Sequence, residues 1–205
     1  MYSIHPFRFG LYLYTRSSIN LIHIRLVNRH IFNINGNILI NSSVQRSLRK
    51  HFQWLKEQIS IPLIAAGGIA TGKGMLAAMV LGADGVQMGS RFVASFESSA
   101  HDNFKNTVLS VKEGDTQVTL KELAPVRLIK NKFYQDLQEL YAKCPTVEEL
   151  KSLLGRARAK RGMFEGDLIE GELEIGQIAG LIHEVKSVEA IVQEVISEFD
   201  EVKNS

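Results

Sequence analysis

The chain has 205 residues, 45% hydrophobic and 22% charged, which is typical of a globular protein, and no apolar run approaches the roughly 20 residues of a membrane-spanning helix. The formal net charge of +2 at pH 7 gives no reason to expect nucleic acid as a partner. The single cysteine, Cys144, excludes an internal disulfide framework and favours a reducing compartment, so we expect a cytoplasmic protein.

Residues 1–56 differ in character from the rest of the chain. They contain eight Lys or Arg and no Asp or Glu, whereas the remainder has 16 basic and 22 acidic residues. Three interpretations compete: an organelle presequence, a nucleic-acid-binding arm of basic and aromatic residues, and unrelated sequence in place of a missing front half. We favour the third, and treat 1–56 as a basic segment that is either disordered or aberrant.

Two elements are predicted before residue 60. Asn37–Ile40 is β-like and follows Asn35-Gly36, a pair typical of hairpin turns. From Ser43 to Ile59 the pattern becomes helical, since apolar residues recur at Leu48, Phe52, Leu55 and Ile59.

A strand–helix–strand unit is predicted from Ile61 to Phe92. An apolar run of strand length ends in Gly67-Gly68. A helical stretch follows, and Gly82 stands where a glycine would end it. A second apolar strand then ends in Gly89-Ser90. Both strand ends offer backbone N–H groups on one rim, which suits an anion, above all a phosphate.

Helices are expected to dominate after Phe92. Ser98 or Ser99 is the predicted cap of a helix reaching about Lys112, Gln117–Leu120 is a short strand, and Pro125 begins a helix through Leu140. Thr146 and Glu149 form a capping box at the start of the next helix. A glycine-rich loop region spans residues 162–180, and a final helix runs from about Val188 to Val202.

Two nucleotide-binding motifs fit the glycines only formally. Residues 67–73 match G-x-x-x-x-G-K, but position 74 is glycine and lacks the hydroxyl that binds magnesium. Residues 72–77 match a dinucleotide fingerprint, but the next strand ends without the acidic residue that holds a ribose. We therefore consider a nucleoside triphosphate loop and a dinucleotide site weak alternatives.

A phosphate site shared by two strand ends fits better. In (β/α)₈ barrels such a site is often built by the loops after strands 7 and 8. Gly67 and Gly68 would close strand 7, and Gly89 and Ser90 would close strand 8. The competing explanation is that these glycines only permit tight turns, but two consecutive strands with this ending favour the phosphate.

The stretch "IPLIAAGGIATGKGMLAAMVLGADGVQMGSRFVASFESSAH", with the later "APVRLIKN" and "GQIAGLIHE", resembles the C-terminal part of the nitronate monooxygenases. The flavin-dependent enoyl-acyl-carrier-protein reductases are similar in the same region. The resemblance covers about residues 57–205. It implies an α/β fold, namely the last strands of a TIM-type (β/α)₈ barrel with their phosphate-binding loops, followed by C-terminal helices.

By the same resemblance the cofactor is FMN. Six residues match the family's FMN phosphate cradle: Gly67, Gly68, Gln87, Met88, Gly89 and Ser90. Gln177 matches a family glutamine near the flavin. The implied reaction is oxidation of an alkyl nitronate with O₂, and no metal is expected.

Residues 1–56 depart from the family. Relatives have strands 1 to 6 there, together with a catalytic histidine in a Gly-His-Gly-like context, and nothing in 1–56 resembles either. We therefore assign no catalytic residue and expect a truncated, inactive chain that binds FMN weakly or not at all. An enoyl reductase-like fragment, a non-catalytic fragment and a phosphosugar-type barrel fragment are the alternatives. The trio Ser98, His101 and Asp102 is too close along one helix for a hydrolytic triad.

Overall fold

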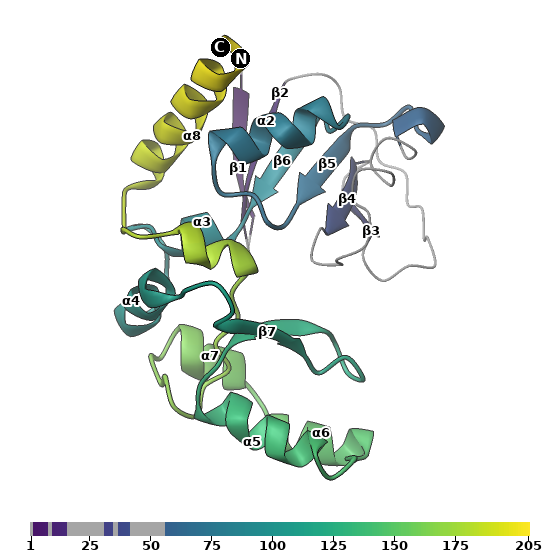
Figure 1. The fold of residues 1–205 in the computed structure, drawn as a ribbon, viewed down its shortest axis with the longest axis vertical. Coiled ribbons are helices and arrows are strands. Elements are labelled where there is room, and N and C mark those ends of the chain that lie inside the picture. The colour runs from purple at the N-terminus through teal and green to yellow at the C-terminus, as the bar shows by residue number, and fades with distance from the viewer. Residues whose placement is uncertain (1, 8–9, 16–30, 35–36, 42–55) are drawn as a thin grey trace. The chain divides into compact units, whose positions relative to one another are not determined.

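The computed structural model describes residues 2–7, 10–15, 31–34, 37–41 and 56–205, with side chains from Lys56 onward. The chain divides into two compact units, residues 1–92 with 188–205 and residues 93–187. The described part mixes helices and strands, which confirms the expected combination of the two (Figure 1). None of its helices is both long and apolar enough to cross a membrane.

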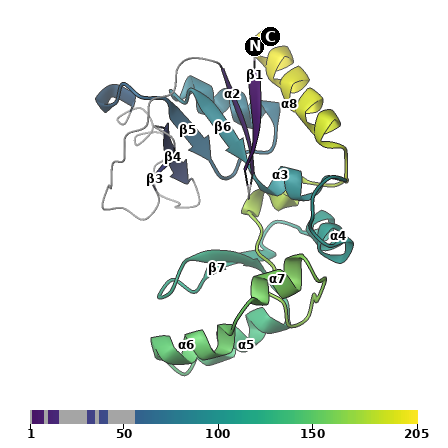
Figure 2. The same cartoon turned by 180° about the vertical axis from the view of Figure 1, so that it is seen from behind.

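A six-stranded sheet forms the first unit's centre, in the order β1-β2-β6-β5-β4-β3 (Figures 1 and 2). The strands are β1 Tyr2–Phe7, β2 Gly10–Thr15, β3 Ile31–Ile34, β4 Asn37–Asn41, β5 Leu63–Ala66 and β6 Gly85–Met88. The neighbouring strands β4, β5 and β6 run parallel, whereas β3 pairs with β4, and β2 with β1 and β6, in antiparallel fashion.

The predictions for the chain before residue 60 are only partly within the described residues. The strand predicted over Asn37–Ile40 is confirmed as β4. Its Asn35-Gly36 turn lies outside the described part. The same holds for most of the helix predicted from Ser43 to Ile59, of which residues 56–58 are described and are helical.

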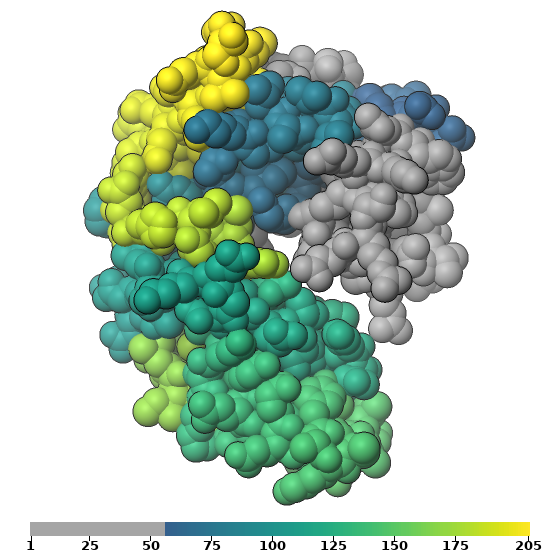
Figure 3. Space-filling model, in the orientation of Figure 1, coloured from purple at the N-terminus to yellow at the C-terminus, as the bar shows by residue number. Residues whose placement is uncertain are grey.

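Two helices cover one face of β5 and β6. Helix α2 (Gly72–Val80) connects the strands, as predicted, and α8 (Val188–Lys203) confirms the predicted final helix. Alternate strand residues point into their shared core, which includes Leu63, Ala65, Val86, Met88, Met75, Ile191, Val195 and Phe199. Figure 3 shows the yellow surface of α8 directly beside the blue surface that follows residue 56.

Both ends of α2 are tightly held. At its start Gly72 lies against the backbone of α8, so that a Cβ there would be 2.3 Å from Phe199 N and 2.3 Å from Val195 O. At its end the amides of Gly82 and Ala83 donate to the carbonyls of Met79 and Ala78, at 2.9 and 3.1 Å. These are the two bonds of a Schellman motif, which confirms the stop at Gly82.

The second unit combines a two-stranded antiparallel sheet with short helices. Its elements are α4 Asp102–Ser110, β7 Thr116–Thr119, β8 Val126–Ile129, α5 Lys132–Tyr141, α6 Val147–Leu154, α7 Arg158–Met163 and the 3₁₀ helix η1 Gln177–Leu181. The short strand predicted at Gln117–Leu120 is confirmed as β7, one residue earlier, and the capping box of Thr146 and Glu149 is confirmed in α6.

Two predictions in this unit are wrong. The helix expected from Pro125 to Leu140 is strand β8 followed by α5, because residues 126–129 pair with β7 and Asn131 caps a new helix by accepting from Tyr134 N. Neither Ser98 nor Ser99 caps α4. His101 does so, since its Nδ1 accepts a hydrogen bond from Asn103 N at 3.1 Å.

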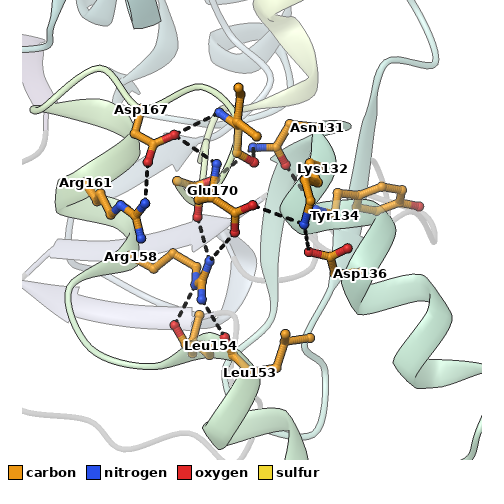
Figure 4. Close-up of polar contacts among 12 residues, drawn as sticks. Asn131, Lys132, Tyr134, Asp136, Leu153, Leu154, Arg158, Arg161, Asp167 and Glu170 are labelled. Carbon is orange, nitrogen blue, oxygen red and sulfur yellow. Dashed lines mark hydrogen bonds and ion pairs between the residues drawn. The ribbon is translucent and has the colours of Figure 1, made fainter.

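Two side chains hold the glycine-rich loop after α7 (Figure 4). The Asn131 amide donates to three loop carbonyls, those of Leu168, Ile169 and Gly171. The Arg158 guanidinium donates to the carbonyls of Leu153, Leu154 and Glu170. It also lies 4.5 Å from the centre of the Phe133 ring. The region predicted only as a loop is therefore partly helical and fixed by defined hydrogen bonds.

Glu172 is a buried acid within this loop region, with 6% of its surface exposed. Burial raises its pKa to about 7, and the neighbouring carboxylate of Glu174 adds to the rise while Arg158 opposes it. The folded state therefore binds a proton more tightly than the unfolded chain does. The free energy of unfolding should consequently fall as the pH rises from about 4.5 toward 7.

We expect Gly72→Ala to destabilise the protein by about 3 kcal/mol, because the new methyl group would overlap backbone atoms of α8 that cannot move independently. Urea unfolding measures the change. Gly74→Ala is the matched control in the same helix, since its nearest contact would be Thr71 Oγ1 at 3.3 Å. Equal losses in the two variants would contradict the close approach of α8 at Gly72.

We expect Glu172→Gln to be more stable than the unmodified protein at pH 8, by up to about 3 kcal/mol, and to match it near pH 4.5. Gln cannot ionise, so the loss of stability between these pH values should shrink. Urea unfolding at several pH values tests this. Glu165→Gln, at an exposed position, is the control and should keep the pH dependence. An unchanged pH profile in Glu172→Gln would refute the role given to Glu172.

Candidate functional site

The carboxyl ends of β5 and β6 meet at one edge of the first unit's sheet. The strands are parallel neighbours, and Ala66 stands opposite Gln87 in their register. The loops that follow, Gly67-Gly68 and Gly89-Ser90, therefore begin side by side. This is the arrangement that the two-strand phosphate site requires.

The loop residues after both strands leave the rim open. Gly67 and Gly68 adopt φ of +86° and +71°, a left-handed conformation that strains any residue with a Cβ. Gly67, Gly68 and Gly89 are all exposed. Backbone, rather than side chains, therefore forms this edge, and a ligand can approach it closely.

The two faces of β6 have different roles. Val86 and Met88 point into the core beneath α2 and α8, at 0% and 1% exposure. Met88 can therefore offer a ligand only its backbone. Gln87 lies on the opposite face, and its Oε1 is buried without a hydrogen-bond partner among the described residues. A buried oxygen of this kind is normally paired with a hydrogen-bond donor, and a bound ligand could supply that donor.

The start of α2 is already occupied by groups of the protein. Gly72 N donates to Glu198 Oε2 at 2.6 Å, and Gly74 N donates to Thr71 Oγ1 at 3.1 Å. Lys73 Nζ lies 3.6 Å from Glu198 Oε1. Both weak alternatives, the triphosphate loop and the dinucleotide site, would need these amides for phosphate. In the structure these amides are bonded to groups of the chain itself.

The second loop leads into α3 (Ser90–Val93), a single turn. Phe92 N donates to the Gly89 carbonyl at 2.9 Å. Arg91 is only 6% exposed, and its Nη2 lies 3.1 Å from Glu194 Oε2 of α8. A buried guanidinium with a carboxylate partner thus stands directly after Ser90.

The two histidines whose side chains are described, His101 and His183, both belong to the second unit, and His101 caps α4. His5 lies in strand β1 of the first unit's sheet. The Ser98 hydroxyl accepts from Ala100 N, and Asp102 lies 3.8 Å from Lys105, so the trio of Ser98, His101 and Asp102 forms local turn and helix contacts. Gln177 begins η1, also in the second unit.

Sequence reasoning missed Glu194 and Glu198. They lie one turn apart at the border of the apolar stripe of α8, where glutamates are common on any surface helix. Gly72 was noted only as part of a motif. A glycine in the first turn of a helix, where Ala is favoured, is the one signal that a close contact was required there.

The family model and the curated relatives name the same family. The model of the family described as nitronate monooxygenase matches residues 41–198. A probable nitronate monooxygenase of Staphylococcus saprophyticus is 36% identical over 149 residues, which are 72% of this chain and 41% of that protein. The chain thus spans less than half the length of this relative.

Two solved structures are similar as well. FabK from Thermotoga maritima has a TM-score of 0.74 and 34% identity, over 82% of this chain and 56% of its own. The nitroalkane oxidase of Streptomyces ansochromogenes has a TM-score of 0.61 and 27% identity, over 77% of this chain and 45% of its own. The family match extends over most of the sequence and includes both strand tips. The chain belongs to the nitronate monooxygenase family.

Proposed function

We propose that the rim formed by Gly67, Gly68, Gln87, Met88, Gly89 and Ser90 binds the phosphate end of FMN, in an oxidoreductase of the nitronate monooxygenase type. The observation that carries the proposal is the placement of two exposed glycine loops at the ends of neighbouring parallel strands. The substrate class is an alkyl nitronate, oxidised with O₂. The lone cysteine is exposed, and we place the protein in the cytoplasm on that ground.

The residues present suit this cofactor. A phosphate needs several N–H donors and close backbone approach, and small residues at the rim allow both. The buried Gln87 Oε1 needs a donor, and FMN carries hydroxyl and ring N–H groups. Flavin, when bound, would supply the oxidation chemistry. The chain's own residues would bind and orient it.

A nitronate oxidase also needs a base and a surface for the flavin ring. The family resemblance places both ahead of the phosphate loops, and the family model matches this chain only from residue 41. Among the first-unit residues whose side chains are described, 56–92 and 188–205, there is no histidine. We therefore propose that this chain contributes the site for the phosphate of the cofactor, and we assign it no catalytic residue.

An enoyl reductase-like role is the second candidate, because the sequence also resembles the flavin-dependent enoyl-acyl-carrier-protein reductases, and FabK from Thermotoga maritima has a TM-score of 0.74 with this chain. Such an enzyme would pass hydride from NAD(P)H through flavin to an enoyl thioester. Both candidates use the same phosphate rim. Assays on a full-length relative distinguish them, with an alkyl nitronate and O₂ in one arm and NADH with a crotonyl thioester in the other.

We expect the purified chain to bind FMN more tightly than riboflavin, which lacks the phosphate, by about tenfold, with weak absolute affinity. Gly89→Asp should abolish this preference, because a carboxylate on the rim repels phosphate. Quenching of flavin fluorescence measures both affinities. Gly155→Asp, at an exposed turn of the second unit, is the control. Equal affinity of the unmodified chain for FMN and riboflavin would refute the site.

We expect no O₂ consumption when the chain, saturated with FMN, is mixed with propyl-2-nitronate in an oxygen electrode. The reason is that no catalytic base is assigned to it. A full-length nitronate monooxygenase serves as the positive control. Turnover by a yellow, monomeric sample would show that the chain carries a complete active site.

A further inference from the structure

Helix α8 contacts a residue that follows each loop of the proposed phosphate rim, Gly72 after the first and Arg91 after the second. Its carboxylates Glu194 and Glu198 are four residues apart and therefore lie on one face, one turn from each other. Figure 1 shows α8 next to α2. Each carboxylate reaches a residue that follows a different loop.

Glu198 holds the loop after β5. Its Oε2 accepts from Gly72 N at 2.6 Å, a short, charge-assisted bond. Because Gly72 has no side chain, the α8 backbone lies in direct contact with it. The segment from Gly67 to Gly72 is thus anchored at one end by β5 and at the other by α8.

Glu194 holds the loop after β6. Its carboxylate lies 3.1 Å from Arg91 Nη2, and the Arg91 side chain is 8% exposed. A buried guanidinium is costly without an anion, so this pair fixes where Arg91 can lie. Arg91 directly follows Gly89-Ser90, and the ion pair therefore fixes the second loop as well.

We propose that Glu194 and Glu198 are positioning residues that set the distance between the two loops of the FMN phosphate rim. The inference rests on the function proposed above. A phosphate held by two separate loops needs both within about 0.5 Å of their productive positions. Helix α8 is bonded next to both loops and would therefore fix their positions without contacting the ligand itself.

Glu194 is half exposed and Glu198 about one quarter exposed, whereas the Arg91 side chain that pairs with Glu194 is buried. A purely structural role would give a loss of stability spread over the first unit. A positioning role gives a local effect at the loop that each carboxylate holds. The two roles are separated by measurements that resolve individual loops.

Backbone hydrogen exchange of the flavin-free protein is the first test. Glu198→Ala should speed exchange about tenfold in residues 67–74, and Glu194→Ala should do so in residues 89–93. Glu201→Ala, at an exposed position of the same helix, is the control and should change neither loop. Should Glu198→Ala fail to fold, Glu198→Gln gives the same comparison. Uniform acceleration throughout the first unit, or none, would overturn the proposal.

Flavin titration is the second test. Each alanine variant at Glu194 or Glu198 should weaken FMN binding about fivefold and riboflavin binding less than twofold. Equal losses for the two flavins, or no loss, would count against positioning of the phosphate loops. Lack of FMN preference in the unmodified chain would refute the proposed function itself. Hydrogen exchange would then still decide whether α8 holds the loops.

Discussion

The contact between Gly72 and α8 is the constraint on which the first unit depends. The bond from Gly72 N to Glu198 Oε2 joins residues 126 positions apart, with the whole second unit between them in sequence. It requires a residue without a side chain, because the helix backbone occupies the space of a Cβ. The C-terminal helix is thus part of the first unit's core and not an appendage to the second.

This contact also explains why the glycine motif is not a nucleotide loop. Helix N-termini attract anions, and here the anion is a carboxylate of the same chain. The glycines consequently have separate tasks: Gly67 and Gly68 shape the open rim, whereas Gly72 admits α8. The glycines of the G-x-x-x-x-G-K pattern therefore meet two separate structural requirements, and the pattern does not form a triphosphate site.

Sequence reasoning succeeded where local signals decide structure. Periodicity, the glycine stop and the capping box sufficed for β5, α2, β6, α6 and α8. It failed for residues 126–129, whose β-branched Val126 and Ile129 fit either periodicity, because their pairing with β7 is a tertiary contact. The strand tips of the candidate site were predictable, because the carboxyl ends of the two parallel strands of a βαβ unit meet at one edge of the sheet. The carboxylates of α8 were not, since nothing local shows that Glu198 reaches an amide 126 positions earlier.

The relatives of this chain indicate which part of the chemistry its residues serve. Proteins described as a probable nitronate monooxygenase, as FabK and as a nitroalkane oxidase are all similar to it, although the descriptions name different activities. Under the proposed function these enzymes would share a flavin cofactor. Binding of that cofactor best explains a region that is common to all of them. A phosphate rim suits that role, because under the proposed function it would bind the end of FMN remote from the reacting ring. Under the proposed function, residues outside this rim would select the substrate, whereas α8 and the two strand tips would bind and position the cofactor.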